Sequence, residues 1–381
     1  LNSATSNYSI NANNINILSS FEETPLPMRK KSSFLDNNHY PHLNNNNIEI
    51  LQLENYKVIA TIGIGSLSKV KLVQDKSNNK VLAVKIIRSK ELIESKQSDK
   101  IRNEFEILKV IDHPFIIKMK SFNLTSSHIF FGLQYIPGGD LFSLLRIQGT
   151  LNFEETRFYI AQTICALLYL HSIGVIYRDV KPENFLLNSN GYIKLTDFSI
   201  SKPCRGKTYT FCGTPEYLAP EIVINTGHTT ACDFWSLGIV AYEFLVGITP
   251  FSDEDPFTVY DRILKGRYKF PKNMNPEART FIRQLLIGDP KKRLGVGGFE
   301  KQSDKGVGSK IGTTNISNSN AISDLVNNPF FEGFDWVALE KMTMSSYHVP
   351  KVKNNADTSN FAHFCDDSYE NLLDYAFEND D

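Results

Sequence analysis

Short apolar stretches separated by turn residues dominate the early part of the patterned region. They alternate or run apolar over strand length, and turn formers such as Gly63 and Gly65 stand between them. The predicted strands are residues 56–61, 69–74, 81–88, 116–122 and 128–135. The first three are joined by short turns and predict an antiparallel meander.

The pattern changes after the sequence Pro-Gly-Gly at 137–139, where apolar positions recur at helical spacing. One helical stretch also lies among the strands and ends near residue 110. The helices predicted beyond the change are residues 141–146, 154–171, 233–246, 257–264 and 278–286. We therefore expect an α+β, bilobal fold, with a small antiparallel β lobe that contains one main helix and a larger, mainly helical lobe.

Two segments have little apolar periodicity. Residues 1–50 contain 12 Asn, and residues from about 297 to 323 are dominated by Gly, Ser, Asn, Thr and Lys. Such compositions bury too little apolar surface to offset the entropy of ordering, so we expect a flexible tail and a disordered insertion. The predicted organisation is a tail over 1–50, a small lobe over 51–136, a large lobe over 137–334 that includes the insertion, and a C-terminal tail over 335–381.

Composition excludes several classes of protein. The chain has 381 residues with 41 basic and 42 acidic side chains, a formal charge of −1, so we expect no nucleic-acid partner. The longest apolar run, residues 164–170, predicts no membrane span, and the polar start is unlike a secretory signal. Five scattered cysteines favour free thiols in a reducing compartment, so we expect a cytoplasmic location, with the nucleus as a second compartment.

A glycine loop lies between the first two predicted strands, at residues 63–70. Glycines let backbone amides approach an anion closely, so the loop could cover phosphates, although two glycines alone are more often only a turn. A dinucleotide-binding fingerprint would open a helix and be followed by an acid about 20 residues on. Here the loop opens a strand, and a cation, Lys85, follows it, which argues against a dehydrogenase.

Lys85 lies within a β-branched strand, where a lysine is usually an edge residue that faces water. The alternative is a lysine held for a phosphate, which needs a carboxylate to position it. Glu104 shares one helical face with Ile101, Phe105 and Leu108, so it lies on the apolar stripe. A charge there is costly unless paired, and the competing interpretation is a carboxylate at the edge of the stripe.

A polar loop at 177–184 precedes a predicted hairpin that Asn-Gly at 190–191 closes. The hairpin brings its ends together, so Asn184 and Asp197 can face one cavity as oxygen ligands for Mg²⁺. Asp179 could accept a proton from an attacking hydroxyl. Each of these residues alone is more often a cap or a turn former, but their joint occurrence with Lys85 and Glu104 makes coincidence improbable.

Together these motifs resemble those of eukaryotic protein kinases. The strings TFCGTPEYLAPE at 210–221 and DTSNF at 357–361 are similar to the AGC group, and within it to catalytic subunits of cyclic-AMP-dependent protein kinases. The resemblance covers roughly residues 50–365 outside the insertion. It implies ATP and Mg²⁺ as cofactors and a serine/threonine protein kinase activity.

The resemblance also implies roles for the residues of the cleft. Lys85 would contact the α- and β-phosphates of ATP and pair with Glu104, and Lys181 would contact the transferred phosphoryl group. Asp179 would deprotonate the substrate hydroxyl, while Asn184 and Asp197 would hold Mg²⁺. The other implied nucleotide-binding positions are Gly63, Gly65, Ser66, Val70, Ala83, Leu133, Leu186, Thr196 and Phe361.

Regulation and substrate choice follow from the same resemblance. Thr210 would carry an activating phosphate, bound by Arg178, Lys202 and Lys100, and an upstream kinase could add it. The acidic positions that would select substrates with Arg or Lys ahead of the phosphorylated Ser or Thr are Asp140, Glu183, Glu216 and Glu243. A separate cyclic-AMP-binding regulatory subunit is expected as a partner by analogy.

The sequence departs from the family pattern at two positions. Ser68 replaces the usual third glycine of the phosphate loop, and Ser199 follows Asp197-Phe198 where glycine is usual. Neither change removes a catalytic group, so both bear on ATP affinity and regulation. A non-catalytic scaffold would normally lack a catalytic group, and a kinase with its own cyclic-nucleotide-binding domains would need more than the roughly 50 low-complexity residues ahead of the core.

Overall fold

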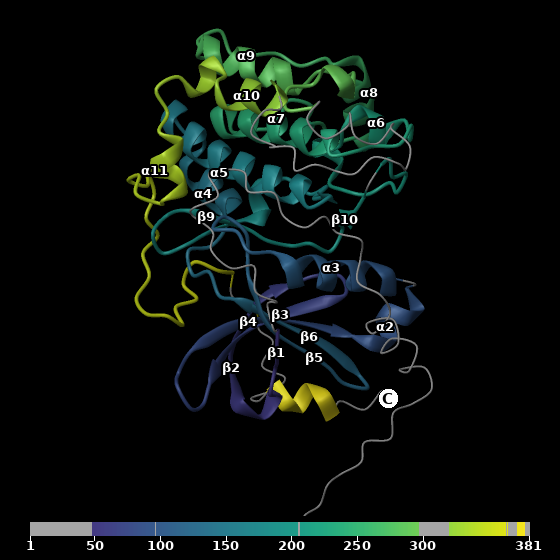
Figure 1. Cartoon of the computed structure of the whole chain (residues 1–381), viewed down its shortest axis with the longest axis vertical. Helices are drawn as coiled ribbons and strands as arrows, with labels where there is room; N and C mark the ends of the chain where they lie inside the picture. Colours follow the sequence, from purple (N-terminus) through teal and green to yellow (C-terminus); the bar gives the residue numbers. More distant parts are fainter. Residues whose placement is uncertain are drawn as a thin grey trace, which may run out of the picture.

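The computed structural model describes residues 48–95, 97–204, 206–296, 320–362, 364 and 372–377. The predicted tail lies outside the described residues up to position 47, and the predicted insertion lies outside them from 297 to 319. Within the described part the chain forms a β-rich lobe and a larger helical lobe, as predicted (Figure 1).

The small lobe is built on one sheet of six strands, in the order β1-β5-β6-β4-β3-β2. The strands are β1 (Glu49–Ile50), β2 (Tyr56–Ile64), β3 (Ser68–Asp75), β4 (Val81–Arg88), β5 (Met119–Leu124) and β6 (His128–Gln134). The pairs β2–β3 and β3–β4 are antiparallel, which confirms the meander. Their register places Val70 opposite Lys85, so the strand that follows the glycine loop lies beside the lysine.

One strand of the sheet was not predicted, and one predicted strand begins at a different residue. Glu49 and Ile50 fall in the predicted tail, yet they pair in parallel with β5, because a sheet edge offers free backbone groups that no local pattern reveals. The strand predicted from residue 116 begins at Met119 instead. Ile116 makes a parallel bridge to Leu195 in the large lobe, so its burial reflects contact between the lobes.

Both faces of this sheet are covered. One face packs against α3 (Ser98–Val110), which follows α2 (Ser89–Glu94) and buries Ile101, Ile107 and Leu108. The other face packs against a 3-10 helix, η8 (Leu372–Phe377), whose Leu372 and Tyr375 are buried. In Figure 1 this C-terminal helix lies across the sheet from α3. A helix of the small lobe itself and a segment from the C-terminal end of the described chain therefore cover the two faces of the sheet.

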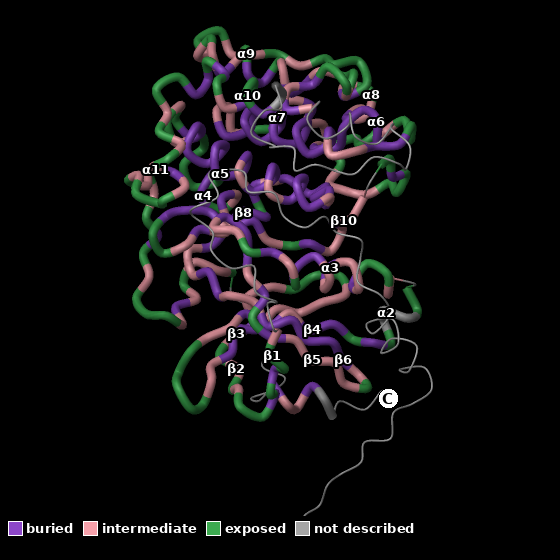
Figure 2. The backbone as a smooth tube through the Cα atoms, viewed as in Figure 1, coloured by how far each residue is buried: buried purple, intermediate pink, exposed green. Residues whose placement is uncertain are grey.

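The large lobe is organised around two long helices, α5 (Phe153–Ser172) and α7 (Ala231–Val246), which are buried almost throughout (Figure 2). A capping box between Asn152 and Glu155 begins α5. The other helices are α4 (Leu141–Gln148), α6 (Pro220–Val223), α8 (Pro256–Lys265), α9 (Pro276–Leu285), α10 (Asn320–Val326) and α11 (Trp336–Glu340). No helix among the described residues is long and apolar enough to cross a membrane.

The predicted helices differ from the observed ones at their ends, and helix α10 was not predicted at all. Helices α8 and α9 each begin at a proline, because Asp255 and Asn275 cap the first turn of the helix and a proline is tolerated at the first helical position. Helix α10 begins at Asn320, inside the predicted insertion, and its Ile322, also inside it, is buried in the core. The local composition of that stretch therefore hid a contact with the core.

Four short strands complete the active-site side of the large lobe. They are β7 (Val175–Ile176), β8 (Phe185–Leu187), β9 (Ile193–Leu195) and β10 (Lys202–Pro203). Strands β8 and β9 form the predicted hairpin, with Phe185 opposite Leu195. Gly191 has φ of 78°, the left-handed conformation that the tight turn requires.

Candidate active site

A cavity of about 840 Å³ is lined by residues of both lobes. Every nucleotide-binding position predicted from the sequence lines it, and so do Glu104, Asp140, Glu183 and Asp197. Asp179, Lys181, Asn184, Glu216 and Glu243 are not among its lining residues and lie on the large-lobe side. The glycine loop closes on itself, because the Gly65 amide donates to the Ser68 carbonyl at 2.7 Å. The Ser68 hydroxyl lies 3.1 Å from where a Cβ on Gly65 would stand, so Gly65 leaves room for this serine.

Lys85 and Glu104 form a short ion pair, with Lys85 Nζ 2.7 Å from Glu104 Oε1. Only 2% of the Glu104 side chain and 12% of the Lys85 side chain is exposed. Burial lowers the pKa of Lys85, but Glu104 and Asp197 outweigh burial and hold that pKa above its ordinary value. Lys85 therefore presents a permanent positive charge to the cavity, and the predicted pairing is confirmed.

The polar loop at 177–184 contains Asp179, the predicted proton acceptor, and is called the catalytic loop from here on. It is fixed by Asp233, which is fully buried at the start of α7. Its carboxylate accepts the amide of Arg178 at 2.7 Å and the amide of Tyr177 at 3.0 Å. His171 Nε2 lies 2.7 Å from the same carboxylate. Arg178 adopts φ of 70°, a costly conformation that these contacts stabilise. A residue more than 50 positions away thus sets the course of the loop that contains Asp179.

Asp179 lies in a network of polar side chains. Lys181 Nζ is 3.0 Å from Asp179 Oδ2, and Asn184 Nδ2 donates to the same oxygen at 2.8 Å. Thr214 donates to Asp179 Oδ1 at 3.4 Å and accepts a hydrogen bond from Lys181 at 3.0 Å. Among the described residues, both oxygens of the carboxylate therefore have a donor, and the contact to Oδ1 is the longest of these.

Asn184 and Asp197 lie at the open end of the β8–β9 hairpin. The Thr196 amide donates to the Asn184 carbonyl at 3.0 Å, so Asp197 directly follows the residue paired with Asn184. Burial raises the pKa of Asp197, but Lys85 at 3.8 Å and hydrogen bonds from Ser199 outweigh it and hold the pKa below its usual range. Asp197 is therefore ionised across the physiological range.

These two residues suit a hard cation that retains other ligands. The amide nitrogen of Asn184 is bonded to Asp179, so its amide oxygen is the group available to a metal. The described residues contain no group of three or more His, Cys, Asp or Glu side chains that could hold a metal ion. One carboxylate and one amide oxygen match Mg²⁺, which is usually bound by one or two protein oxygens together with phosphates and water.

The C-terminal tail closes one side of the cavity. Phe361 packs with Ala83 and Val70, and its ring centroid lies 5.8 Å from that of Tyr135. The Tyr135 hydroxyl donates to the Asp357 carbonyl at 2.6 Å. Phe361 thus lines the cavity on a tail that is held by a contact spanning more than 200 residues, and its role toward a nucleotide stays a prediction.

The four acidic residues predicted to read substrates are electrostatically linked. Burial raises the pKa of Glu243 to about 7, and repulsion from Glu183 and Glu216 adds to this, against a hydrogen bond from Tyr217. Burial also raises the pKa of Glu183, with repulsion from Asp140 contributing. Asp140 also caps α4 through the Ser143 amide, so it has a structural role in addition. The structure thus brings these carboxylates together beside the catalytic loop.

Thr210 is exposed on the segment between β10 and α6. The three cations predicted to bind a phosphate there all act on Cys212. Burial raises the pKa of the Cys212 thiol, and the positive charges of Arg178, Lys100 and Lys202 oppose this rise. Arg178 Nη1 is buried and has no hydrogen-bond partner within the described part of the chain. Lys202 donates to Thr208 at 3.0 Å. The segment therefore has unsatisfied positive charge close to Thr210.

Comparison with known proteins agrees with this geometry. A family model described as protein kinase domain matches residues 56–302. The chain belongs to the protein kinase family. The human cAMP-dependent protein kinase catalytic subunit PRKX is 36% identical over 321 residues, which cover 84% of this chain and 84% of the relative.

Relatives from other organisms give the same result. The Drosophila melanogaster cAMP-dependent protein kinase catalytic subunit 3 is 37% identical over 309 residues, which cover 81% of this kinase and 49% of that relative. The mouse cAMP-dependent protein kinase catalytic subunit PRKX is 36% identical over 309 residues, covering 81% of each chain. The kinase is therefore a serine/threonine kinase similar to the catalytic subunits of cAMP-dependent protein kinases, and its family uses ATP and a divalent metal ion.

Some residues of the kinase site were not singled out from the sequence. His171 supports Asp233, Thr214 links Lys181 to Asp179, and Tyr135 anchors the tail. Thr214 stands inside the string Gly-Thr-Pro-Glu, which was a usable signal. No sequence signal pointed to His171 or Tyr135, because their partners are distant in the chain.

Proposed function

We propose that this kinase transfers the γ-phosphoryl group of ATP, with Mg²⁺, to Ser or Thr residues preceded by Arg or Lys. The observation that most supports the proposal is an ionised lysine and an ionised aspartate that meet at one inter-lobe cavity. Lys181, which pairs with the catalytic aspartate Asp179, also acts electrostatically on Asp197. The four linked carboxylates beside the catalytic loop support the basic preference.

In this mechanism the protein orients groups and offsets charge. Bound ATP would supply the phosphoryl group, and Asn184 and Asp197 would hold Mg²⁺, which would offset phosphate charge. Lys85, kept in place by Glu104, orients the phosphates, and the amides of the glycine loop cover them. Asp179 accepts the proton of the substrate hydroxyl, and Lys181 stabilises negative charge beside it.

Nucleotide specificity would come from the apolar walls of the cleft. Val70, Ala83, Leu133, Leu186 and Phe361 line the cavity and offer flat contact to a purine ring. Thr196, Gly63, Gly65 and Ser66 complete the proposed nucleotide-binding set. Because Phe361 lies on the tail, docking of the tail contributes to nucleotide affinity.

Phosphorylation of Thr210 would activate the kinase. A phosphate brings about −1.5 to −2 charges at pH 7, and the nearby cations include a buried guanidinium nitrogen without a partner. Arg178 precedes Asp179, so a phosphate bound there would order the catalytic loop and the segment together. An upstream kinase or the kinase itself could add this phosphate.

A cyclic-AMP-binding regulatory subunit is the partner we propose, on the basis of the relatives' names. An exposed apolar surface beside Thr210 supports a protein partner of some kind. Tyr209 is 59% exposed and Phe257 on α8 is 80% exposed, while the Phe211 ring packs against Tyr260 of α8. The cytoplasmic and nuclear location stays a prediction, which imaging of a tagged copy would check.

A peptide-array assay with radiolabelled ATP tests the proposal. Phosphorylation should need Mg²⁺, favour peptides with Arg or Lys two or three positions ahead of Ser or Thr, and disappear in Lys85→Met. Adding a cyclic-AMP-binding regulatory subunit should inhibit transfer, and cyclic AMP should restore it. Indifference to upstream basic residues would refute the substrate proposal, and no inhibition would refute the partner alone.

A further inference from the structure

A second cavity lies in the large lobe, in the segment between α8 and α9. It has a volume of about 500 Å³ and is lined by Gly266, Tyr268, Lys269, Phe270, Arg279 and Arg283. In Figure 1 these two helices lie at the end of the large lobe far from the sheet. No residue of this cavity belongs to the proposed catalytic or substrate-binding groups, so it is a separate site.

The lining is positively charged and has no counter-charge. It contains three cations and no carboxylate. None of Lys269, Arg279 and Arg283 forms an ion pair with a residue that the structure describes. Arg279 Nη2 donates to the carbonyls of Pro271 and Lys272 at 3.1 and 3.4 Å, while its Nε is buried without a partner among those residues. Nη1 of Arg279 and the whole guanidinium of Arg283 therefore have unused donors.

The two guanidinium groups are held in place by aromatic rings. Arg279 and Arg283 lie 5.7 and 5.2 Å from the ring centroid of Phe270. Phe270 contacts Tyr268 edge to face at 5.3 Å, and Tyr268 packs against Phe251 in the core at 5.5 Å. The cavity is thus formed before any ligand arrives, which lowers the entropic cost of binding.

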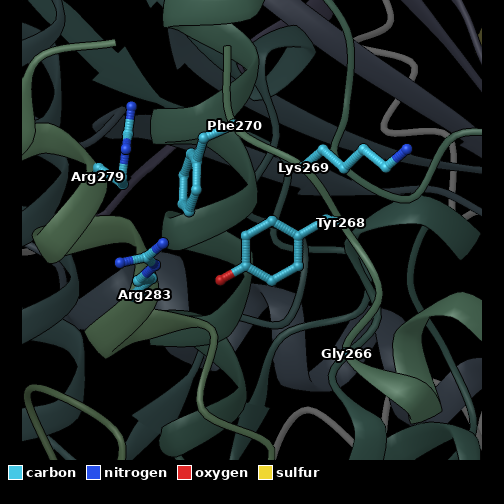
Figure 3. A pocket seen from close by; sticks show the side chains of 6 residues that line it. All are labelled: Gly266, Tyr268, Lys269, Phe270, Arg279 and Arg283. Atoms are coloured by element: carbon cyan, nitrogen blue, oxygen red, sulfur yellow. The ribbon is translucent and has the colours of Figure 1, made fainter. Parts of the chain in front are cut away.

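Figure 3 shows how the side chains point. The Tyr268 hydroxyl is turned toward Arg283, and the Lys269 side chain extends away from both arginines. Burial raises the pKa of Tyr268 and Arg283 opposes this, so the phenol remains a neutral donor near that guanidinium. The Tyr268 hydroxyl and the Arg283 guanidinium therefore lie together, the Arg279 guanidinium lies beside the same Phe270 ring, and Lys269 is directed elsewhere.

We propose that this cavity binds a phosphoserine or phosphothreonine of a partner protein. A phosphate monoester has three acceptor oxygens and nearly two negative charges at pH 7, which matches two guanidinium groups and a hydroxyl. A carboxylate has two oxygens and one charge and would leave one arginine unpaired. Because Lys269 points away, it suits a second acidic group further along a polypeptide, which inorganic phosphate does not have.

Fluorescence anisotropy with a labelled phosphopeptide tests this. The peptide has one phosphoserine followed by aspartates and has no basic residue, so it avoids the catalytic cleft. The whole kinase should bind it at least tenfold more tightly than the unphosphorylated peptide. Arg283→Ala should weaken binding about tenfold or more. The matched control is Arg267→Ala, an exposed arginine in the same segment that does not line the cavity, and it should change binding by less than about twofold.

Further arms separate the sources of the anion. Phosphorylation of a short basic peptide should be unchanged in Arg283→Ala, because Arg283 is exposed and lies outside the catalytic machinery. Lys269→Ala should weaken binding of the phosphopeptide but leave binding of inorganic phosphate unchanged. Equal binding of the phosphopeptide by Arg283→Ala and the unsubstituted kinase would overturn the site. Inorganic phosphate competing as tightly as the peptide would overturn the polypeptide source.

Discussion

Glu243 should make recognition of basic substrates depend on pH. Its side chain is 4% exposed, and burial with repulsion from Glu183 and Glu216 raises its pKa to about 7. With that pKa, about 10% of the carboxyl groups are ionised at pH 6 and about 90% at pH 8. Only the ionised form pairs well with an arginine, so KM for a basic peptide should fall up to about tenfold between these pH values.

Initial-rate kinetics at pH 6, 7 and 8 measure this. Two peptides are compared: one has upstream arginines, and in the other these arginines are replaced by alanine. The ratio of their KM values cancels other groups that titrate. Glu243→Gln keeps a hydrogen-bond acceptor for Tyr217 but removes the titrating charge, so its ratio should stay flat with pH. A pH-dependent ratio in this variant, or a flat one in the unsubstituted kinase, would refute the reasoning.

The same pKa predicts an effect on stability. The folded state favours protonated Glu243, so this contribution is present at low pH and is lost as pH rises from the unfolded pKa of 4.5 through about 7. At 1.36 kcal/mol per pH unit, the interval corresponds to a cost of about 3 kcal/mol above pH 7. Glu243→Gln should therefore gain Tm relative to the unsubstituted kinase at pH 8 but not at pH 5, in the absence of substrate.

Three further predictions concern catalysis, activation and stability. Asp179→Asn should lower kcat by about 10² to 10⁴, as loss of a general base does, while nucleotide affinity measured by calorimetry stays similar; a normal kcat would remove its role as base. Thr210→Ala should lower activity and leave Arg178 Nη1 without a partner, and full activity with an unphosphorylated segment would contradict the switch. Arg293→Met should lower the free energy of unfolding by about 3–5 kcal/mol. The reason is that the buried Glu221 would lose two hydrogen bonds from Arg293, at 2.7 and 3.0 Å. An unchanged denaturant unfolding curve would show that this pair is dispensable.

Local patterns were sufficient wherever the cause was local. The meander, the hairpin closed at Gly191 and the helical stripe of α3 were all readable, because strand alternation, turn chemistry and helical spacing depend on neighbouring residues. Glu104 was predicted as a buried partner for Lys85 because a carboxylate on an apolar stripe needs a cation. The structure confirms that pairing at hydrogen-bond distance.

Contacts between distant segments were not readable from the chain. Strand β1, the contact of His171 with Asp233 and the bond from Tyr135 to Asp357 join residues whose spacing contains no signal. The pKa of Glu243 likewise depends on carboxylates brought near it by folding. The basic cavity also depends on folding, because its three cations gather in one place only in the folded chain.

The sequence by itself therefore determined the kinds of element and the residue types that do chemistry, since these follow from periodicity and side-chain properties. Beyond the pair of Lys85 and Glu104, only the tertiary structure decided which charges meet, which are buried and which lack partners among the described residues. Electrostatic energy depends on distance and solvent exposure, and both are set by packing between segments far apart in the chain.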